Sequence, residues 1–310
     1  MTQFILLFRN HLSLKLSLIF ALIFLSLLPS QNYYNQLDLS NLNPVVRSVN
    51  HQFLPFSDYP VNLNNISPPP LTARGIIVMD ADSKAILYQR NPDLRLLPAS
   101  TTKIMTALIV LDEYDLSDTA TIGFIDTDPI NMELELDEVI TIENLLYGLL
   151  VGSANDAAIA LAQHHPQGKS GFINAMNQKA KDLHLTQTQF TNPVGFDDFG
   201  HYTTVHDLSL LTAHALKNRT FKKLVSTINL TVSDVDHTIT HELENINQLL
   251  GQVPGLSGVK TGYTQLAGEC LVTSTKRQNH HIITVVLNSQ DRFQESASLI
   301  NWAFNSFTWQ

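Results

Sequence analysis

The hydrophobic and polar positions divide the chain into strand-like ends and a helical middle. Residues 74–80 and 85–90 are apolar runs rich in β-branched residues, and the segment A-D-S-K between them is typical of a hairpin turn. Helical periodicity dominates residues 112–226. We therefore predict an α/β protein of the mixed α+β kind, with one antiparallel sheet built from both ends of the domain and a helical insertion. Further expected strands are 228–235, 237–241, 258–264, 269–275 and 281–287, and expected helices are 142–151, 157–163, 172–183, 204–216 and 293–304.

Residues 97–111 (L-P-A-S-T-T-K-I-M-T-A-L-I-V-L) carry a strong helical pattern. Pro98 ends the preceding segment, Ser100 is a good capping residue, and apolar residues then recur at helical spacing. We expect a helix that begins at or near Ser100. Gly152 is expected to cap a later helix, over residues 142–151.

Ser100 and Lys103 share one face of that helix, because they are three residues apart. Their neighbours are apolar, and desolvation favours a neutral lysine that can accept a proton. The pair therefore fits a serine nucleophile with a lysine base. An isolated S-x-x-K is a weak signal, and an ordinary cap beside a solvated lysine remains the alternative at this point.

Charge and composition exclude several classes of function. The net charge of -9 provides no basic field, so we expect no nucleic-acid partner. Cys270 is the single cysteine, so the chain can form neither an internal disulfide nor a cysteine-based zinc site. The 12 histidines include no H-E-x-x-H motif and are interpreted as loop or surface residues. We expect no metal and no cofactor.

The N-terminus has the pattern of an export signal. Arg9 and Lys15 precede an uncharged apolar run over residues 16–28, which ends at Pro29. Such a run suits a signal peptide or a short N-terminal membrane anchor, with the rest of the chain outside the cytoplasm. We divide the chain into this segment (1–30), an Asn- and Pro-rich linker (31–70) and one domain (71–310).

Two further motifs follow S-T-T-K in order: S-A-N at residues 153–155 and K-T-G at residues 260–262. With S-x-x-K they form a known signature of serine acyl-transfer enzymes. In such a site Ser100 attacks an acyl carbon while Lys103 takes its proton. Ser153 then relays a proton to the leaving amine, and Asn155 holds the substrate backbone.

The K-T-G motif is expected to bind the substrate. Lys260 adds positive charge, which lowers the pKa of Lys103 and attracts an anion, while the hydroxyl of Thr261 suits a carboxylate. Gly262 lets a substrate lie close to the strand edge. Backbone N–H groups of Ser100 and Tyr263 are expected to form an oxyanion hole.

Ser257 begins a second S-x-x-K match, which ends at Lys260. Gly258 and Val259 predict a strand there, and strand residues three apart point to opposite faces. Ser257 is therefore not expected to be a nucleophile.

Over residues 72–302 the chain resembles the serine-type D-alanyl-D-alanine carboxypeptidases, which are low-molecular-mass penicillin-binding proteins. The resemblance rests on P-A-S-T-T-K-I-M-T-A-L, L-L-Y-G-L-L-V-G-S-A-N-D-A-A, the N-P-V-G loop and G-V-K-T-G-Y-T. It implies a β-lactamase/transpeptidase-like fold and removal of D-alanine from peptidoglycan stem peptides. It also implies acylation by β-lactam antibiotics, no metal or cofactor, and a role for Arg292 in binding the terminal carboxylate.

Two alternatives stay open. A class A β-lactamase shares the motifs but uses a glutamate in the loop before K-T-G, and residues 187–200 contain none. A catalytically silent, wall-binding homologue would not need to keep the motif residues. The sequence also differs from the usual family pattern in having Ala154 where glycine is common.

Overall fold

The computed structural model describes residues 59–125 and 130–310. These residues lie in one compact unit. The expected signal or anchor (1–30) and most of the expected linker (31–70) lie outside the described residues. Within the described ranges, no helix combines the length and the apolar character that crossing a membrane requires.

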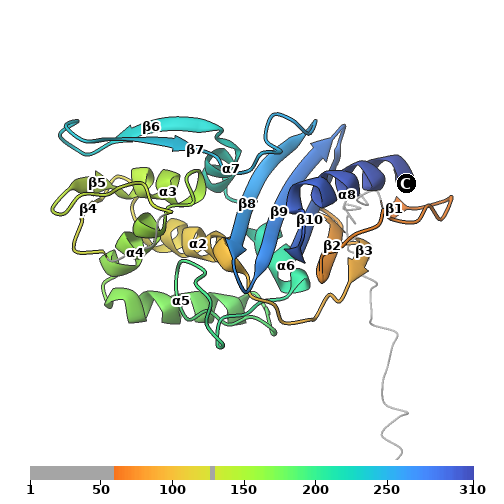
Figure 1. Ribbon diagram of the computed structural model, residues 1–310, viewed down its shortest axis with the longest axis horizontal. Helices are drawn as coiled ribbons and strands as arrows, with labels where there is room; N and C mark the ends of the chain where they lie inside the picture. The colour runs from red at the N-terminus through yellow and green to blue at the C-terminus, as the bar shows by residue number, and fades with distance from the viewer. Residues whose placement is uncertain (1–58, 126–129) are drawn as a thin grey trace, which may run out of the picture. The chain divides into compact units, whose positions relative to one another are not determined.

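A five-stranded antiparallel sheet forms the centre of the unit, in the order β3-β2-β10-β9-β8 (Figure 1). Two strands come from the beginning of the described chain and three from its end, which confirms the predicted sheet built from both ends. Every pair of neighbours is antiparallel. The strands are β2 (Gly75–Asp80), β3 (Ile86–Arg90), β8 (Leu256–Thr264), β9 (Gly268–Arg277) and β10 (His280–Ser289).

Both faces of this sheet are covered by helices. Successive side chains of a strand point to opposite faces, and all six residues of β2 are buried. Ile77 and Met79 join the larger core, which includes residues of α2 (Lys103–Glu113) and α6 (Val205–Ala215), while Ile76 and Val78 join a smaller core under α8 (Arg292–Ser306). The sheet is therefore a central layer between two apolar cores.

The middle of the chain is helical, as predicted. The prediction missed one helix, α7, and a hairpin of three-residue strands, β4 and β5, which are too short to show a clear alternation. Thr141 and Thr204 cap two of the helices, accepting hydrogen bonds from Asn144 N and Asp207 N. These elements are β4 (Thr119–Thr121), β5 (Val139–Thr141), α3 (Ile142–Leu150), α4 (Asn155–His164), α5 (Gly168–Asp182), α6 and α7 (Arg219–Ser226).

A separate hairpin follows α7, formed by β6 (Asn229–Ser233) and β7 (Thr240–Glu244). The expected strand over 237–241 was placed too early, because His237 lies in the turn with φ +58°. The carboxylate of Asp234 accepts hydrogen bonds from Thr238 N and Ile239 N, which closes the turn before β7 begins.

The last residues of the expected linker belong to the folded unit. Strand β1 (Pro60–Val61) pairs with β11 (Thr308–Trp309). The ring of Trp309 stacks against His280 and Phe304, and its Nε1 donates to Asp80 Oδ2 at 2.9 Å. This short sheet therefore ties the start of the described chain and its end to the last residue of β2 and the first residue of β10.

We expect Trp309→Ala to lower the free energy of unfolding by about 2 kcal/mol, because the stacked ring and its hydrogen bond are both lost. Urea denaturation measures the change. Trp309→Phe should recover the stacking and part of the stability, and Thr308→Ala, which changes an exposed neighbour, is the control. Equal stability of the Ala variant and the wild type would contradict a stabilising role for this ring.

Candidate active site

Ser100 lies in a 3₁₀ turn, η3 (Ala99–Thr102), that leads directly into α2. The helix thus begins where predicted, but neither end of the turn has a side-chain cap, so Ser100 does not have the expected capping role. Ser100 Oγ lies 3.0 Å from Lys103 Nζ, within hydrogen-bonding distance. The shared face predicted from their spacing is therefore present in the structure.

The side chain of Lys103 is fully buried. Its Nζ donates to Asn155 Oδ1 at 2.8 Å and to the carbonyl oxygen of Val194 at 3.1 Å. Burial lowers the pKa of Lys103 well below its usual value; the charge of Lys260 lowers it further, and Asp156 opposes the shift. Burial therefore favours the neutral amine over the ammonium.

Ser153 lies just before α4, and Asn155 is the first residue of that helix. Ser153 is buried and has φ +57°, so Ser153 and not Gly152 adopts the left-handed conformation after α3. Its hydroxyl makes no hydrogen bond to any residue that the structure describes. The backbone that follows it is held, because Ala154 N donates to Gly148 O and Asn155 N donates to Ile130 O.

Strand β8 brings the K-T-G residues against the turn that carries Ser100. A Cβ at Gly262 would lie 2.9 Å from Ser100 N and 3.0 Å from Ala99 Cβ, so only glycine allows this approach. Lys260 is buried on the same face of the strand, and its Nζ donates to Thr261 O at 3.2 Å. Burial and the nearby charge of Arg292 lower the pKa of Lys260 to about 7.

The remaining predicted binding residues lie around Gly262. Arg292, the first residue of α8, donates from Nη1 to Gly262 O at 2.7 Å. Thr261 is buried between Lys260 and Gly262, and the side chain of Tyr263 is 60% exposed. The structure thus brings all nine predicted site residues into one region, and among them Ser100, Lys103 and Asn155 are joined by hydrogen bonds between side chains.

The N-P-V-G loop (residues 192–196) supplies a contact that the sequence analysis missed. Asn192 Oδ1 accepts from the backbone N–H of Val194, Gly195 and Phe196, which folds the loop so that Val194 O faces Lys103. Gly195 has φ +100°, and a Cβ there would overlap the carbonyl oxygen of Ala99. The asparagine, proline and glycine of this motif signalled a turn, but a backbone acceptor has no sequence signature of its own.

His201 follows this loop and lies in a loop segment, as expected for the histidines, but its side chain is fully buried. Burial lowers its pKa to about 4. Thr191 N donates to Nδ1, so the proton of the neutral ring is on Nε2, which lies 2.8 Å from Thr102 Oγ1. The ring therefore ties the loop to the turn that carries Ser100.

The other candidates have ordinary surroundings. Ser257 lies in β8 as predicted, exposed and near Ser274, whose Oγ is 3.2 Å away.

His237 contacts Ser233, whereas His241 is buried against Glu138. No group of side chains in the described ranges is arranged to hold a metal ion. Cys270 is buried, and burial raises the pKa of its thiol to about 12.

Comparison with known proteins identifies the fold and the family of this chain. The fold is that of the DD-peptidases and β-lactamases, and a crystal structure of the Streptomyces K15 DD-transpeptidase matches with a TM-score of 0.73 and 31% sequence identity. That match covers 77% of this chain and 100% of the other. The chain belongs to the D-alanyl-D-alanine carboxypeptidase family, whose sequence model matches residues 62–291. The family resemblance inferred from the motifs is thereby confirmed.

Two curated relatives show the extent of the match. D-alanyl-D-alanine carboxypeptidase DacF of Bacillus subtilis is 31% identical over 246 residues, which are 76% of this chain. D-alanyl-D-alanine carboxypeptidase DacA of Haemophilus influenzae is 34% identical over 260 residues, which are 78% of this chain. The chain spans 63% and 64% of the length of these two relatives.

Gly195→Ala should lower the free energy of unfolding by about 3 kcal/mol or more, because it combines a left-handed backbone with a clash on Ala99. Gly168→Ala is the matched control: Gly168 also has a positive φ, but a Cβ there meets nothing within 4 Å. Its cost should be about 1 kcal/mol. Equal losses in urea denaturation would show that the clash contributes nothing.

Proposed function

We propose that this protein is a serine D,D-carboxypeptidase that removes the C-terminal D-alanine from peptidoglycan stem peptides through an acyl-enzyme on Ser100. The observation that carries the proposal is the buried Nζ of Lys103, 3.0 Å from Ser100 Oγ, with its pKa lowered by burial. A neutral amine has two N–H groups, and two carbonyl oxygens accept from this nitrogen. Its lone pair is then available to the proton of the Ser100 hydroxyl.

Acylation follows from this arrangement. Ser100 Oγ attacks the carbonyl carbon of the D-alanyl-D-alanine bond as Lys103 takes its proton. The C–N bond then breaks, and the amine of the departing D-alanine receives the proton held by Lys103, relayed through Ser153, whose hydroxyl has no other partner among the described residues. Water hydrolyses the ester with Lys103 as base, which releases the shortened peptide and restores the Ser100 hydroxyl.

The other residues bind the substrate and stabilise charge. We assign the amide nitrogen of Asn155 to the peptide backbone and the backbone N–H groups of Ser100 and Tyr263 to the oxyanion hole. Gly262 keeps the strand edge open for an extended peptide. The terminal carboxylate is assigned to the hydroxyl of Thr261 and to two positive charges near it, Lys260 and Arg292.

β-Lactam antibiotics should acylate the same serine, because their ring contains a strained amide that Ser100 can attack in the same way. The ring amine stays covalently attached after opening and cannot diffuse away. We place the enzyme outside the cytoplasm, attached to the membrane through its N-terminal segment, where its peptidoglycan substrate is found. No step requires a metal or a cofactor.

A β-lactamase needs fast deacylation, and the loop over residues 187–200 offers no glutamate to activate water. The two aspartates of this loop, Asp197 and Asp198, have other partners. Asp197 accepts from Thr264 Oγ1, and Asp198 accepts from Gly200 N. We therefore expect the acyl-enzyme formed with penicillin to be hydrolysed slowly, in contrast to the rapid turnover of penicillin by a β-lactamase.

Ser100→Ala should abolish the covalent penicillin adduct and the release of D-alanine, because the attacking oxygen is gone. Intact-protein mass spectrometry detects the adduct, and peptide mapping locates it. Ser257→Ala is the matched control, since it removes the serine of the second S-x-x-K match and should label like the wild type. An adduct that survives in Ser100→Ala would assign the nucleophile to another residue.

The pH profile of kcat/KM should be bell-shaped. Activity rises with pH as Lys103 loses its proton, and it falls above about pH 7, where Lys260 loses the charge that binds the carboxylate. Lys260→Arg keeps that charge at all working pH values and should move the alkaline limb up by about two pH units or more. An unchanged alkaline limb in Lys260→Arg would remove Lys260 from this role.

A further inference from the structure

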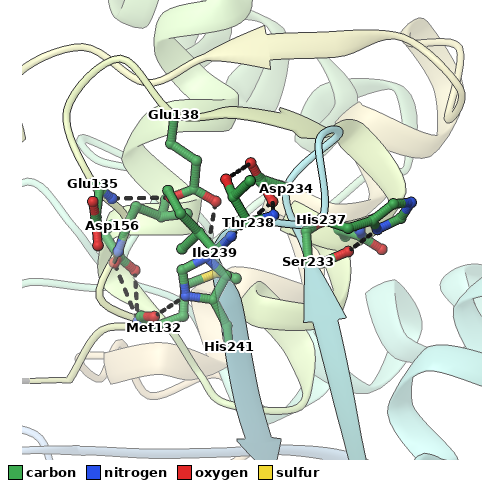
Figure 2. Close-up of polar contacts among 12 residues, drawn as sticks. Met132, Glu135, Glu138, Asp156, Ser233, Asp234, His237, Thr238, Ile239 and His241 are labelled. Atoms are coloured by element: carbon green, nitrogen blue, oxygen red, sulfur yellow. Dashed lines mark hydrogen bonds and ion pairs between the residues drawn. The ribbon is translucent and has the colours of Figure 1, made fainter.

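The loop over residues 130–138 joins two parts of the molecule (Figure 2). On one side it contacts the start of α4, where Asn155 lies, and on the other it contacts His241 of β7. These contacts are hydrogen bonds, and His241, Glu138, Met132 and Asp156 among their partners are buried. The loop therefore lies between the β6–β7 hairpin and the S-A-N segment (residues 153–155) of the proposed active site.

The contacts with α4 are made by backbone groups of the loop. Asn155 N donates to Ile130 O at 2.8 Å. The carboxylate of Asp156 accepts from Met132 N at 3.0 and 3.1 Å and from Leu134 N at 3.1 Å. Asp156 thus binds this loop, and its neighbour Asn155 binds Lys103.

The contacts with the hairpin converge on one ring. His241 is 5% exposed, and both of its nitrogens face acceptors. Nδ1 lies 2.7 Å from Met132 O, and Nε2 lies 2.8 Å from Oε1 of the buried Glu138. A carbonyl oxygen can only accept, so Nδ1 carries a proton. The other carboxylate oxygen of Glu138 accepts from Glu135 N at 3.0 Å.

Met132 is consequently held from two directions, through its N–H by Asp156 and through its C=O by His241. Its side chain packs directly on Gly148 of α3, where a Cβ would overlap the Met132 sulfur. Gly148 O in turn accepts from Ala154 N in the S-A-N segment. A shift of Met132 would therefore be transmitted to this segment through both Asp156 and Gly148.

The S-A-N segment depends on such support. Ser153 adopts a left-handed conformation, which is unfavourable for a residue with a Cβ and persists only where surrounding contacts hold it. The Ser153 hydroxyl forms no hydrogen bond with the described residues, so it does not itself stabilise this conformation. A buried polar contact such as that between His241 Nε2 and Glu138 Oε1 adds little net stability, so a role in fixing geometry is a better account of it.

We propose that His241 is a positioning residue for catalysis: through its Nδ1–H bond to Met132 O it holds the 130–138 loop, and thereby Ser153 and Asn155, in register with Lys103. This inference rests on the proposed function. His241 itself touches neither the reacting groups nor any of the proposed binding residues.

The test compares near-isosteric side chains at position 241 in a Glu138→Gln background. The amide introduced by Glu138→Gln can donate to His241 Nε2 and accept from Glu135 N, so every hydrogen bond is kept without a buried charge. In that background, His241→Asn keeps a donor at the position of Nδ1, whereas His241→Leu has the same size and no donor. Stopped-flow acylation by a fluorescent penicillin separates the acylation rate constant from the affinity of the initial complex.

We expect Glu138→Gln to acylate within about twofold of the wild type. Adding His241→Leu should lower the acylation rate constant about tenfold with little change in initial affinity, and His241→Asn should restore most of that loss. His237→Asn, in the turn of the same hairpin, should change nothing. Thermal unfolding of each variant shows that the compared proteins are folded.

Equal acylation rates for the Leu and Asn variants, whether fast or slow, would overturn the proposal and leave His241 a packing role only. If the Leu variant does not fold, His241→Gln replaces it, because its amide reaches the position of Nε2 but not that of Nδ1. Failure of the wild type itself to form an adduct on Ser100 would instead refute the proposed function. The two failures are thus distinguishable.

Discussion

The site depends on keeping an amine buried without its charge. Lys103 has no exposed surface, and its nitrogen contacts one hydroxyl and two carbonyl oxygens. An ammonium has three N–H groups and a large desolvation cost, so burial makes the neutral form accessible and leaves a lone pair next to Ser100. Lys260 adds a second positive charge whose repulsion acts in the same direction. Four separate parts of the chain, which carry Lys103, Asn155, Val194 and Lys260, must converge to produce this environment.

Close backbone approach brings those parts together. Gly195 and Gly262 press against the same two residues, Ala99 and Ser100, from a loop and from a strand. Neither position tolerates a Cβ without movement, so the turn that carries the serine is confined on two sides. The turn that carries the nucleophile is thus confined by main-chain contacts, whereas Lys103 is held by the side chain of Asn155 and the carbonyl oxygen of Val194.

Much of this site could be predicted from the sequence, because its reactive residues occur in short motifs at the ends of elements. The hairpin before Ser100 and the strand character around Lys260 followed from alternation and β-branched residues. What escaped prediction has no local pattern: the carbonyl of Val194 is a backbone group, and the burial of His241 results from contacts with residues more than a hundred positions away. The left-handed residue was assigned to Gly152 because glycine adopts that conformation most easily, yet tertiary contacts impose it on Ser153.

The pairing of β1 with β11 has a consequence for how this unit can be rearranged. Tyr59 and Gln310 exchange both of their backbone hydrogen bonds, so the two ends of the described unit are neighbours. A linker of a few residues would span the gap between them. The segment over residues 59–310 could therefore be closed into a ring by such a linker. The ring could then be opened at a surface turn such as the one between β6 and β7, without separating any strand from its partner in the central sheet.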